Sequence, residues 1–120
     1  MTPLTLSEKQ QHFTVLVARL IIEATSRNLG LTFGEAYRSP EEAHRLALAG
    51  KGIEHSLHTQ RLAIDLNLFV NGVYQTDSAA YTALGEWWEA QSGDGIVCCW
   101  GGRFTPPDGN HMSVAHDGRK

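Results

Sequence analysis

Two short segments of the chain concentrate side chains that could bind a metal ion. His58 and Asp65 stand just before and inside an alternating apolar run. Asp108 and His111 stand together in a second segment near the end. Two imidazoles and one carboxylate are the donor set of a hydrolytic zinc site, which keeps a fourth position open for water, and a carboxylate that is not a ligand can take that water's proton. The residue types therefore indicate a candidate metal centre at His58, Asp65 and His111.

Each of these residues also has a simpler explanation. Asp65 could be a solvent-facing carboxylate on the polar face of its strand, and His58 an ordinary loop histidine. Asp108 precedes a glycine, and Asp-Gly is a common turn dipeptide. The loop of His58 feeds directly into the strand of Asp65, so both side chains could face one point. Spacing alone leaves both interpretations open.

Periodicity predicts three helices that could position these segments. Apolar residues recur at helical spacing from Phe13 to Ala24, with Ser7 as the expected N-cap and Gly30 as the expected C-terminal left-handed residue. Ser39-Pro40 followed by two acids predicts a second helix that ends near Ala49. The third helix is expected from a cap at Asp77 or Ser78 to about Gln91.

Short strands are expected between the helices. Alternation predicts a strand over 62–69, and Asn71-Gly72 is a hairpin signal with a return strand over 73–75. Further strands are expected over 31–36, 96–100 and 111–114. The mixture of hairpin and helical connections favours an α+β fold, a small and mainly antiparallel sheet flanked by about three helices. Residues 1–120 are expected to form one catalytic domain.

Composition excludes several classes of protein. The chain has 120 residues and a formal net charge of -3, which argues against nucleic-acid binding. No apolar run approaches the ~18–20 residues of a membrane span, and we see no secretory signal, so cytoplasmic synthesis is expected. The two cysteines, Cys98 and Cys99, are adjacent and therefore poorly placed to pair with each other.

An ordered set of motifs resembles the zinc D-Ala-D-Ala carboxypeptidase and L-alanyl-D-glutamate endopeptidase family, which has the hedgehog/DD-peptidase fold and includes VanY-like enzymes and phage endolysins. The motifs, in chain order, are Tyr37-Arg38-Ser39, the group Ser56, His58, Ala63 and Asp65, the pair Trp87-Trp88, Trp100-Gly101-Gly102, and the acid-x-x-His segment that ends at His111. The resemblance spans about residues 33–113.

The resemblance implies a role for each matching residue. His58, Asp65 and His111 would bind one Zn²⁺. Asp108 would be the general base, and Arg38 would polarise the substrate. The alternative for Arg38 is an ion pair with Glu35 or Glu41 at the entrance of the second helix. Two departures stand out: Arg61 occupies a position where the family often has glycine, and Asp108 one where many members have glutamate.

The expected function is that of a zinc-dependent peptidase acting on peptidoglycan stem peptides. We expect an L-alanyl-D-glutamate endopeptidase of the phage endolysin type, monomeric, and active on the cell wall after release, for example through a holin. One alternative is a D-Ala-D-Ala carboxypeptidase. Another is a zinc-binding module of the same fold without activity, and a third is an α+β interaction domain without metal.

Overall fold

The computed structural model describes residues 2–53 and 55–120 and has the expected α+β architecture. The elements, in chain order, are α1 (Leu6–Ser26), β1 (Leu29–Phe33), α2 (Pro40–Leu48), the 3₁₀ helix η1 (Leu57–Gln60), β2 (Ala63–Val70), β3 (Val73–Tyr74), η2 (Ser78–Tyr81), α3 (Thr82–Ala90), β4 (Cys98–Trp100), η3 (Gly101–Arg103) and β5 (His111–Val114). Three α-helices and a small sheet confirm the predicted fold class.

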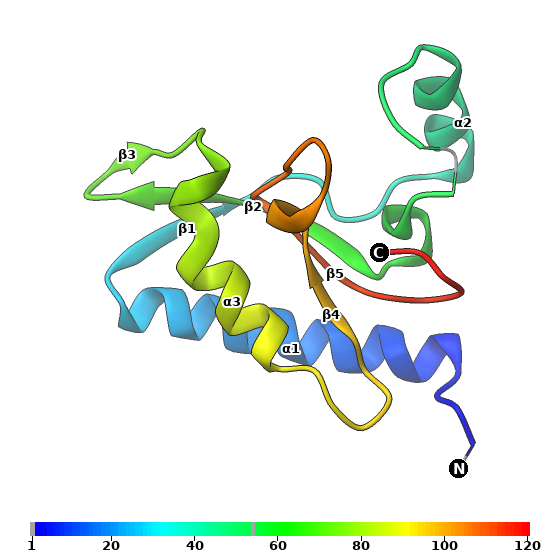
Figure 1. Cartoon of the computed structure of the whole chain (residues 1–120), viewed down its shortest axis with the longest axis horizontal. Coiled ribbons are helices and arrows are strands. Elements are labelled where there is room, and N and C mark those ends of the chain that lie inside the picture. Colours follow the sequence, from blue (N-terminus) through cyan, green and yellow to red (C-terminus); the bar gives the residue numbers. More distant parts are fainter. Residues whose placement is uncertain (1, 54) are drawn as a thin grey trace.

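The sheet has the order β1-β2-β5-β4, and β3 pairs with β2 beside this path. Every described strand pair is antiparallel. The pairing therefore brings β5, from the end of the chain, against β2 from its middle (Figure 1). This non-local pairing positions the candidate metal centre.

Two boundary predictions for α1 are wrong. Thr5, not Ser7, is the N-cap, because its side chain accepts from the backbone N–H of Glu8 while the Glu8 carboxylate accepts from the N–H of Thr5. After the helix, Asn28 rather than Gly30 adopts the left-handed conformation, with φ of 59°. Gly30 lies inside β1, so this strand occupies 29–33 instead of the expected 31–36.

The other elements follow the sequence more closely. Ser39 caps α2 as expected, with Pro40 as its first residue. Asp77 caps η2 by accepting from the N–H of Ala79, and α3 continues from that 3₁₀ turn. The expected hairpin turn at Asn71-Gly72 is present, with both residues at positive φ.

The hydrophobic core lies between the apolar face of the sheet and helices α1 and α3. Leu20 of α1, Leu68 of β2 and Trp88 of α3 are each at most 1% exposed. Trp88 packs edge-on against Phe13, with ring centroids 5.8 Å apart. The alternating burial along β2 turns Asp65 and Asn67 away from this core, so the opposite face of the sheet carries the polar residues.

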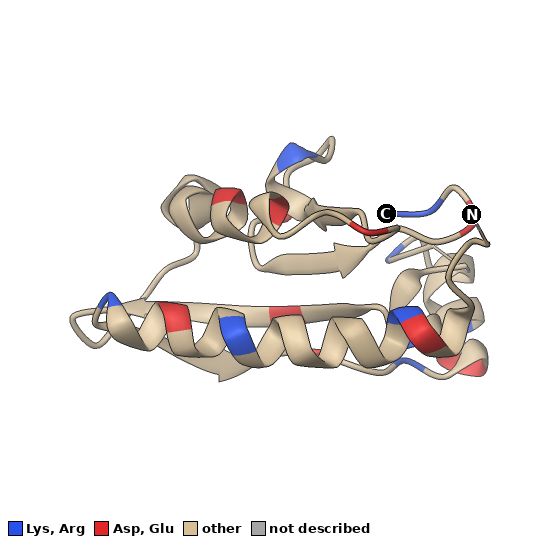
Figure 2. Ribbon diagram, turned by 90° about the horizontal axis from the view of Figure 1, so that it is seen from below, with Lys and Arg blue, Asp and Glu red and all other residues tan. Residues whose placement is uncertain are grey.

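Charged residues of both signs are distributed along α1 (Figure 2). The helix α2 projects from the rest of the chain near the loop that leads to η1 (Figure 1). Among the described residues, no helix combines the length and the apolar character that a bilayer span requires.

Candidate metal centre

The β2–β5 ladder places Asp65 directly opposite His111. Opposed residues of an antiparallel pair point to the same face of the sheet, so the carboxylate and the imidazole face one another. The Asp65 Oδ1 and His111 Nδ1 atoms are 3.3 Å apart. The chain brings this acid and this imidazole together through strand pairing, although they are far apart in sequence.

His58 reaches the same point from η1. Ser56 caps this short helix by accepting from the backbone N–H of His58. The Nδ1 atom of His58 lies 2.8 Å from the carbonyl oxygen of Ala36. A carbonyl can only accept, so this contact assigns the proton to Nδ1 and leaves the Nε2 lone pair free for a metal. Nε2 is 3.4 Å from Asp65 Oδ1.

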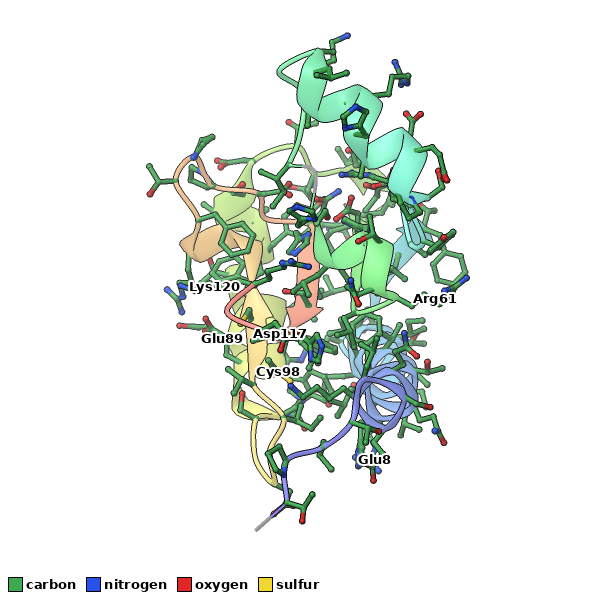
Figure 3. All side chains as sticks on the ribbon, turned by 90° about the vertical axis from the view of Figure 1, so that its right-hand side faces the viewer. Glu8, Arg61, Glu89, Cys98, Asp117 and Lys120 are labelled. Atoms are coloured by element: carbon green, nitrogen blue, oxygen red, sulfur yellow. The ribbon has the colours of Figure 1, made fainter. Side chains whose placement is uncertain are left out.

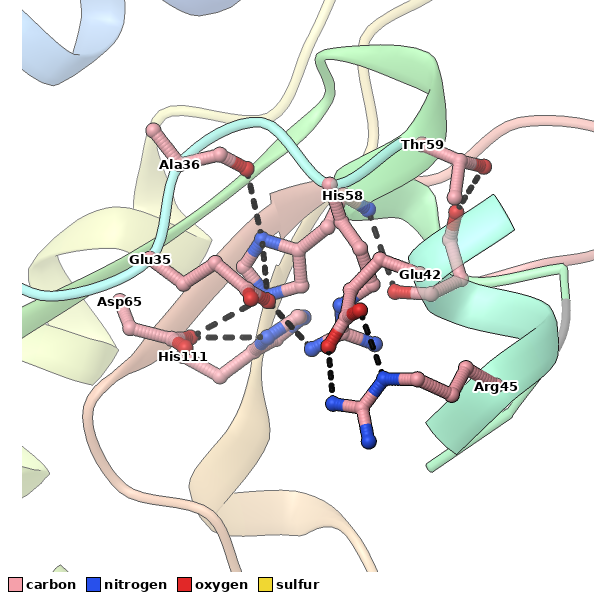
Figure 4. A network of polar contacts seen from close by, with 10 residues as sticks. Glu35, Ala36, Glu42, Arg45, His58, Thr59, Asp65 and His111 are labelled. Carbon is pink, nitrogen blue, oxygen red and sulfur yellow. Dashed lines mark hydrogen bonds and ion pairs between the residues drawn. The ribbon is translucent and has the colours of Figure 1, made fainter. Parts of the chain in front are cut away.

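The three side chains converge on one volume (Figure 4). One ligand atom from each lies within 4.8 Å of the others, and both imidazoles are buried. Asp65 Oδ1 is itself buried and has no hydrogen-bond partner, although two imidazole nitrogens lie beside it. A buried carboxylate oxygen without a donor is costly unless a cation compensates it. The donor set of two imidazoles and one carboxylate fits Zn²⁺.

The electrostatics of the cluster favour the ionised form of Asp65. Burial alone raises the pKa of Asp65, but contacts with His111 and His58 outweigh it and lower the pKa to about 2. Burial also lowers the pKa of His58, whereas Asp65, the Ala36 carbonyl and the charge of Glu35 together raise it above its usual value. Asp65 therefore stays ionised at neutral pH and can attract either a proton or a metal cation to the imidazoles.

Arg38 combines the two interpretations that the sequence left open. Its guanidinium donates to the carboxylate of Glu35 and also lines the cleft around His58. The Arg38 side chain is 14% exposed, and its Nε is buried without a hydrogen-bond partner. Glu35 Oε1 also lies 3.9 Å from His58 Nδ1. The ion pair thus fixes a positive charge beside the metal-ligand cluster.

A tight loop holds Asp108 near His111. The backbone N–H of Asp108 donates to the carbonyl of Gly101, and the N–H of His111 donates to the carbonyl of Asp108. A β-carbon at Gly101 would meet the Asp108 carbonyl oxygen at 2.1 Å, so the loop can close only over glycine. The indole of Trp100 donates to the carbonyl of Gly109 and supports the same loop. Asp108 is therefore both a turn residue and part of the cleft.

The pKa of Asp108 is raised. Burial of part of the side chain is the largest cause, the charge of Asp65 adds to it, and His111 and His58 oppose it. A carboxyl group with a raised pKa is a better proton acceptor than an ordinary exposed aspartate.

One cleft of about 490 Å³ contains all five predicted site residues, which are Arg38, His58, Asp65, Asp108 and His111. Their assigned functions remain predictions, but the structure brings them together. Lys51 and Phe104 also line this cleft, and sequence analysis did not single them out. The Phe104 ring lies 5.3 Å from the His111 ring. Neither has a distinctive sequence signal, because each stands in a glycine- or proline-rich loop.

The structure explains the departure at Arg61. This residue ends η1 in the left-handed conformation, with φ of 56°, which glycine adopts without strain. The guanidinium lies over the ring of Tyr37, 4.1 Å from its centroid. Arg61 is at the periphery of the molecule (Figure 3) and does not line the cleft.

Two acids of the third helix and the two cysteines do not line this cleft. Glu89 pairs with Arg103, and Glu86 lies 3.8 Å from the same guanidinium. Cys98 and Cys99 are free thiols, and burial raises the pKa of Cys98 to about 11. A thiol with so high a pKa is a poor nucleophile and a poor metal ligand at neutral pH.

Comparisons with known proteins agree with this geometry. A family model described as D-alanyl-D-alanine carboxypeptidase matches residues 49–114, which include His58, Asp65 and His111. The chain is also similar to the crystal structure of the L-Ala D-Glu endopeptidase ChiX of Serratia marcescens, with a TM-score of 0.65 and 25% sequence identity. That match covers 85% of this chain and 79% of the other. Comparison with curated protein sequences finds no match.

Proposed function

We propose, from the premise that this chain belongs to the D-alanyl-D-alanine carboxypeptidase family of zinc peptidases, that it cleaves peptidoglycan stem peptides between L-alanine and D-glutamate. The family makes the chain a hydrolase of peptide bonds. The observation that carries the proposal is the convergence of His58, Asp65 and His111 inside one cleft. The named specificity of the Serratia marcescens relative, an L-Ala D-Glu endopeptidase, favours this scissile bond.

Besides the three proposed ligands, the cleft contains residues that could take part in the reaction itself. When bound, Zn²⁺ would polarise the scissile carbonyl and lower the pKa of a water molecule from ~15.7 towards ~7. Asp108, whose raised pKa suits proton acceptance, takes the proton of the attacking water. It then returns that proton to the leaving amine, so its own charge is restored at the end of the reaction.

Arg38 supplies fixed positive charge where the oxyanion of the tetrahedral intermediate develops. Its pairing with Glu35 holds the guanidinium in place before the substrate arrives. Loss of one such preorganised donor commonly costs about 3 kcal/mol of transition-state stabilisation. His58 and His111 remain metal ligands throughout and transfer no proton.

The test is digestion of purified peptidoglycan followed by mass analysis of the fragments. Fragments that begin with D-glutamate, with the muramyl-L-alanine portion left on the glycan, support the endopeptidase. An endolysin role adds the requirement that protein applied from outside lyses cell walls. If purified peptidoglycan is cut after L-alanine but cell walls are not lysed, the endopeptidase activity stands and the endolysin role is wrong.

A second candidate is a D-Ala-D-Ala carboxypeptidase, favoured by the description of the matching family model. It predicts release of free D-alanine with no break at L-alanine. A zinc-binding module without activity is a third candidate, and it predicts bound zinc without any cleaved product. The same digestion therefore separates the three.

A further inference from the structure

The polar face of β2 continues beyond the metal-ligand cluster. Asn67 follows Asp65 by two residues and shares its face of the strand. At a rise of about 3.3 Å per residue, the Asn67 side chain stands about 7 Å further along the strand. This distance corresponds to about two residues of an extended peptide.

A second amide meets Asn67 from the turn that precedes β5. Asn110 Nδ2 donates to Asn67 Oδ1 at 3.2 Å. Asn110 is the immediate neighbour of His111, and its own carbonyl accepts from the backbone N–H of Leu66. The amide pair is thus attached on both sides to residues adjacent to the metal-ligand cluster.

The pair retains unused hydrogen-bonding capacity. Among residues 2–53 and 55–120, the bond between them is the only hydrogen bond of either side-chain amide. The Asn67 Nδ2 and the side-chain Oδ1 of Asn110 therefore have no hydrogen-bond partner in the part of the chain that the structure describes. Both residues are partly exposed, so these groups are accessible. A free donor beside a free acceptor matches the C=O and N–H of a peptide group.

The surface beside the amide pair is open. Thr32 of β1 lies opposite Asn67, and Gly30 lies opposite Phe69. Both β1 residues are small and exposed. Beyond Asn67 these residues border a hollow of about 330 Å³ that also includes Asn71. An extended peptide could therefore lie along this face and still reach the metal-ligand cluster.

We propose that Asn67 and Asn110 form a subsite that binds a backbone amide of the substrate, about two residues from the scissile bond. This inference rests on the proposed peptidase function and deepens it. The Asn67 Nδ2 donates to the substrate carbonyl, and the side-chain Oδ1 of Asn110 accepts from the substrate N–H. Affinity for an extended stem peptide then depends on the pair, whereas affinity for a fragment that lacks this amide does not.

The experiment compares two substrates of the zinc-loaded protein. One is a stem peptide that keeps the muramyl group before L-alanine and at least two residues after D-glutamate, and the other is the shortest peptide that is still cleaved. We expect Asn67→Ala to lower kcat/KM for the extended peptide about 5- to 10-fold, mainly through KM, and to leave the short peptide within about 2-fold.

Asn67→Asp is the matched variant. An aspartate oxygen can still accept from Asn110 Nδ2, so the bond within the pair survives, but the donor to the substrate is lost. We expect it to impair the extended peptide selectively, as Asn67→Ala does, with zinc content unchanged. Gln11→Glu is the control for charge, because it adds the same negative charge on α1, across the sheet from this face, and should affect both peptides equally.

Other results would overturn the subsite. Equal losses on both peptides with Asn67→Ala, and normal kinetics with Asn67→Asp, would mean that the pair only braces the turn before His111. No loss on either peptide would also remove the subsite. Failure of the unsubstituted protein to cleave either peptide would instead remove the proposed function, and that result is visible before any variant is made.

Discussion

Asp65 and His111 are directly opposed across two paired strands, and the Asp65 Oδ1 and His111 Nδ1 atoms are 3.3 Å apart. This relationship fixes two of the three predicted metal ligands on the most regular part of the structure. His58 joins them from a short helix whose register is set by the Ser56 cap. A site built on paired strands is more precisely held than one built on loops alone.

Asp108 should be required for turnover but not for metal binding. Its carboxyl group is outside the proposed ligand set, so Asp108→Ala should retain about one zinc per chain. Loss of a general base should lower kcat by about 10²–10⁴-fold. Asp108→Asn is the matched control for side-chain volume. Stem-peptide cleavage at wild-type rates by either variant would show that Asp108 is not the base.

Replacement of Gly101 by alanine should distort the loop that carries Asp108. The added β-carbon would lie 2.1 Å from the Asp108 carbonyl oxygen and 2.7 Å from the His111 β-carbon. Backbone must move to relieve these contacts, and we expect a loss of about 2 kcal/mol or more in the free energy of unfolding. Thermal unfolding measures it. Gly52→Ala is the control, because the nearest atoms to a β-carbon there are at 3.5 Å. It should unfold at nearly the temperature of the unsubstituted protein, and an equal loss in both variants would contradict this account of Gly101.

Two substitutions of Arg61 should separate the effect of backbone strain on stability from the effect of its contact with Tyr37. Arg61→Ala keeps the unfavourable left-handed backbone and loses the cation–π contact, worth about 0.5–1 kcal/mol at an exposed site. Arg61→Gly loses the same contact but removes the strain. Denaturant titration should therefore rank the glycine variant above the alanine variant in stability. The reverse ranking would indicate that the left-handed conformation carries no cost here.

Stability of the metal-free protein should decline as pH rises above neutrality. The raised pKa of His58 means that its contribution is fully present below its usual value of 6.5 and is lost as pH rises through the raised value. The lowered pKa of Asp65 means that its contribution is present above its usual value of 3.8 and is lost as pH falls towards about 2. Chelator-treated protein should thus have a higher Tm at about pH 5 than at about pH 8.

With zinc bound, the Tm should instead be higher at about pH 8 than at about pH 5, because the metal requires neutral imidazoles and competes with protons for them. The increase in Tm on adding zinc should be larger at about pH 8 than at about pH 5. His58→Ala should abolish most of the pH dependence of Tm, both with and without zinc. An increment that is the same at the two pH values would indicate that zinc binds elsewhere.

The sequence predicted the fold class because helical periodicity, strand alternation and the Asn71-Gly72 turn are local signals. It misplaced the start of α1, since a threonine outside the apolar pattern formed the capping box with Glu8. It shifted β1, because Asn28 took the left-handed position that was expected of Gly30. Such boundaries depend on small differences in local energy that tertiary pairing decides.

The candidate site was less accessible to sequence reasoning alone. Residue types suggested His58, Asp65 and His111, but only the observed register of β2 against β5 brings an acid and an imidazole from separate segments together. Asp108 stood out as the acid beside His111, and the resemblance to a known family matched it to the general base and supplied Arg38. Glu35 was foreseen only as a partner of Arg38, and its approach to His58 Nδ1 required the three-dimensional structure.

The most direct test of the proposed centre is the metal content of protein purified without added zinc, measured by elemental analysis beside His58→Ala and His111→Ala. We expect about one zinc per chain in the unsubstituted protein and far less in both variants, with helical circular dichroism unchanged because neither imidazole belongs to the apolar core. One zinc per chain retained by both variants, or no zinc in the unsubstituted protein after reconstitution, would contradict the centre described above.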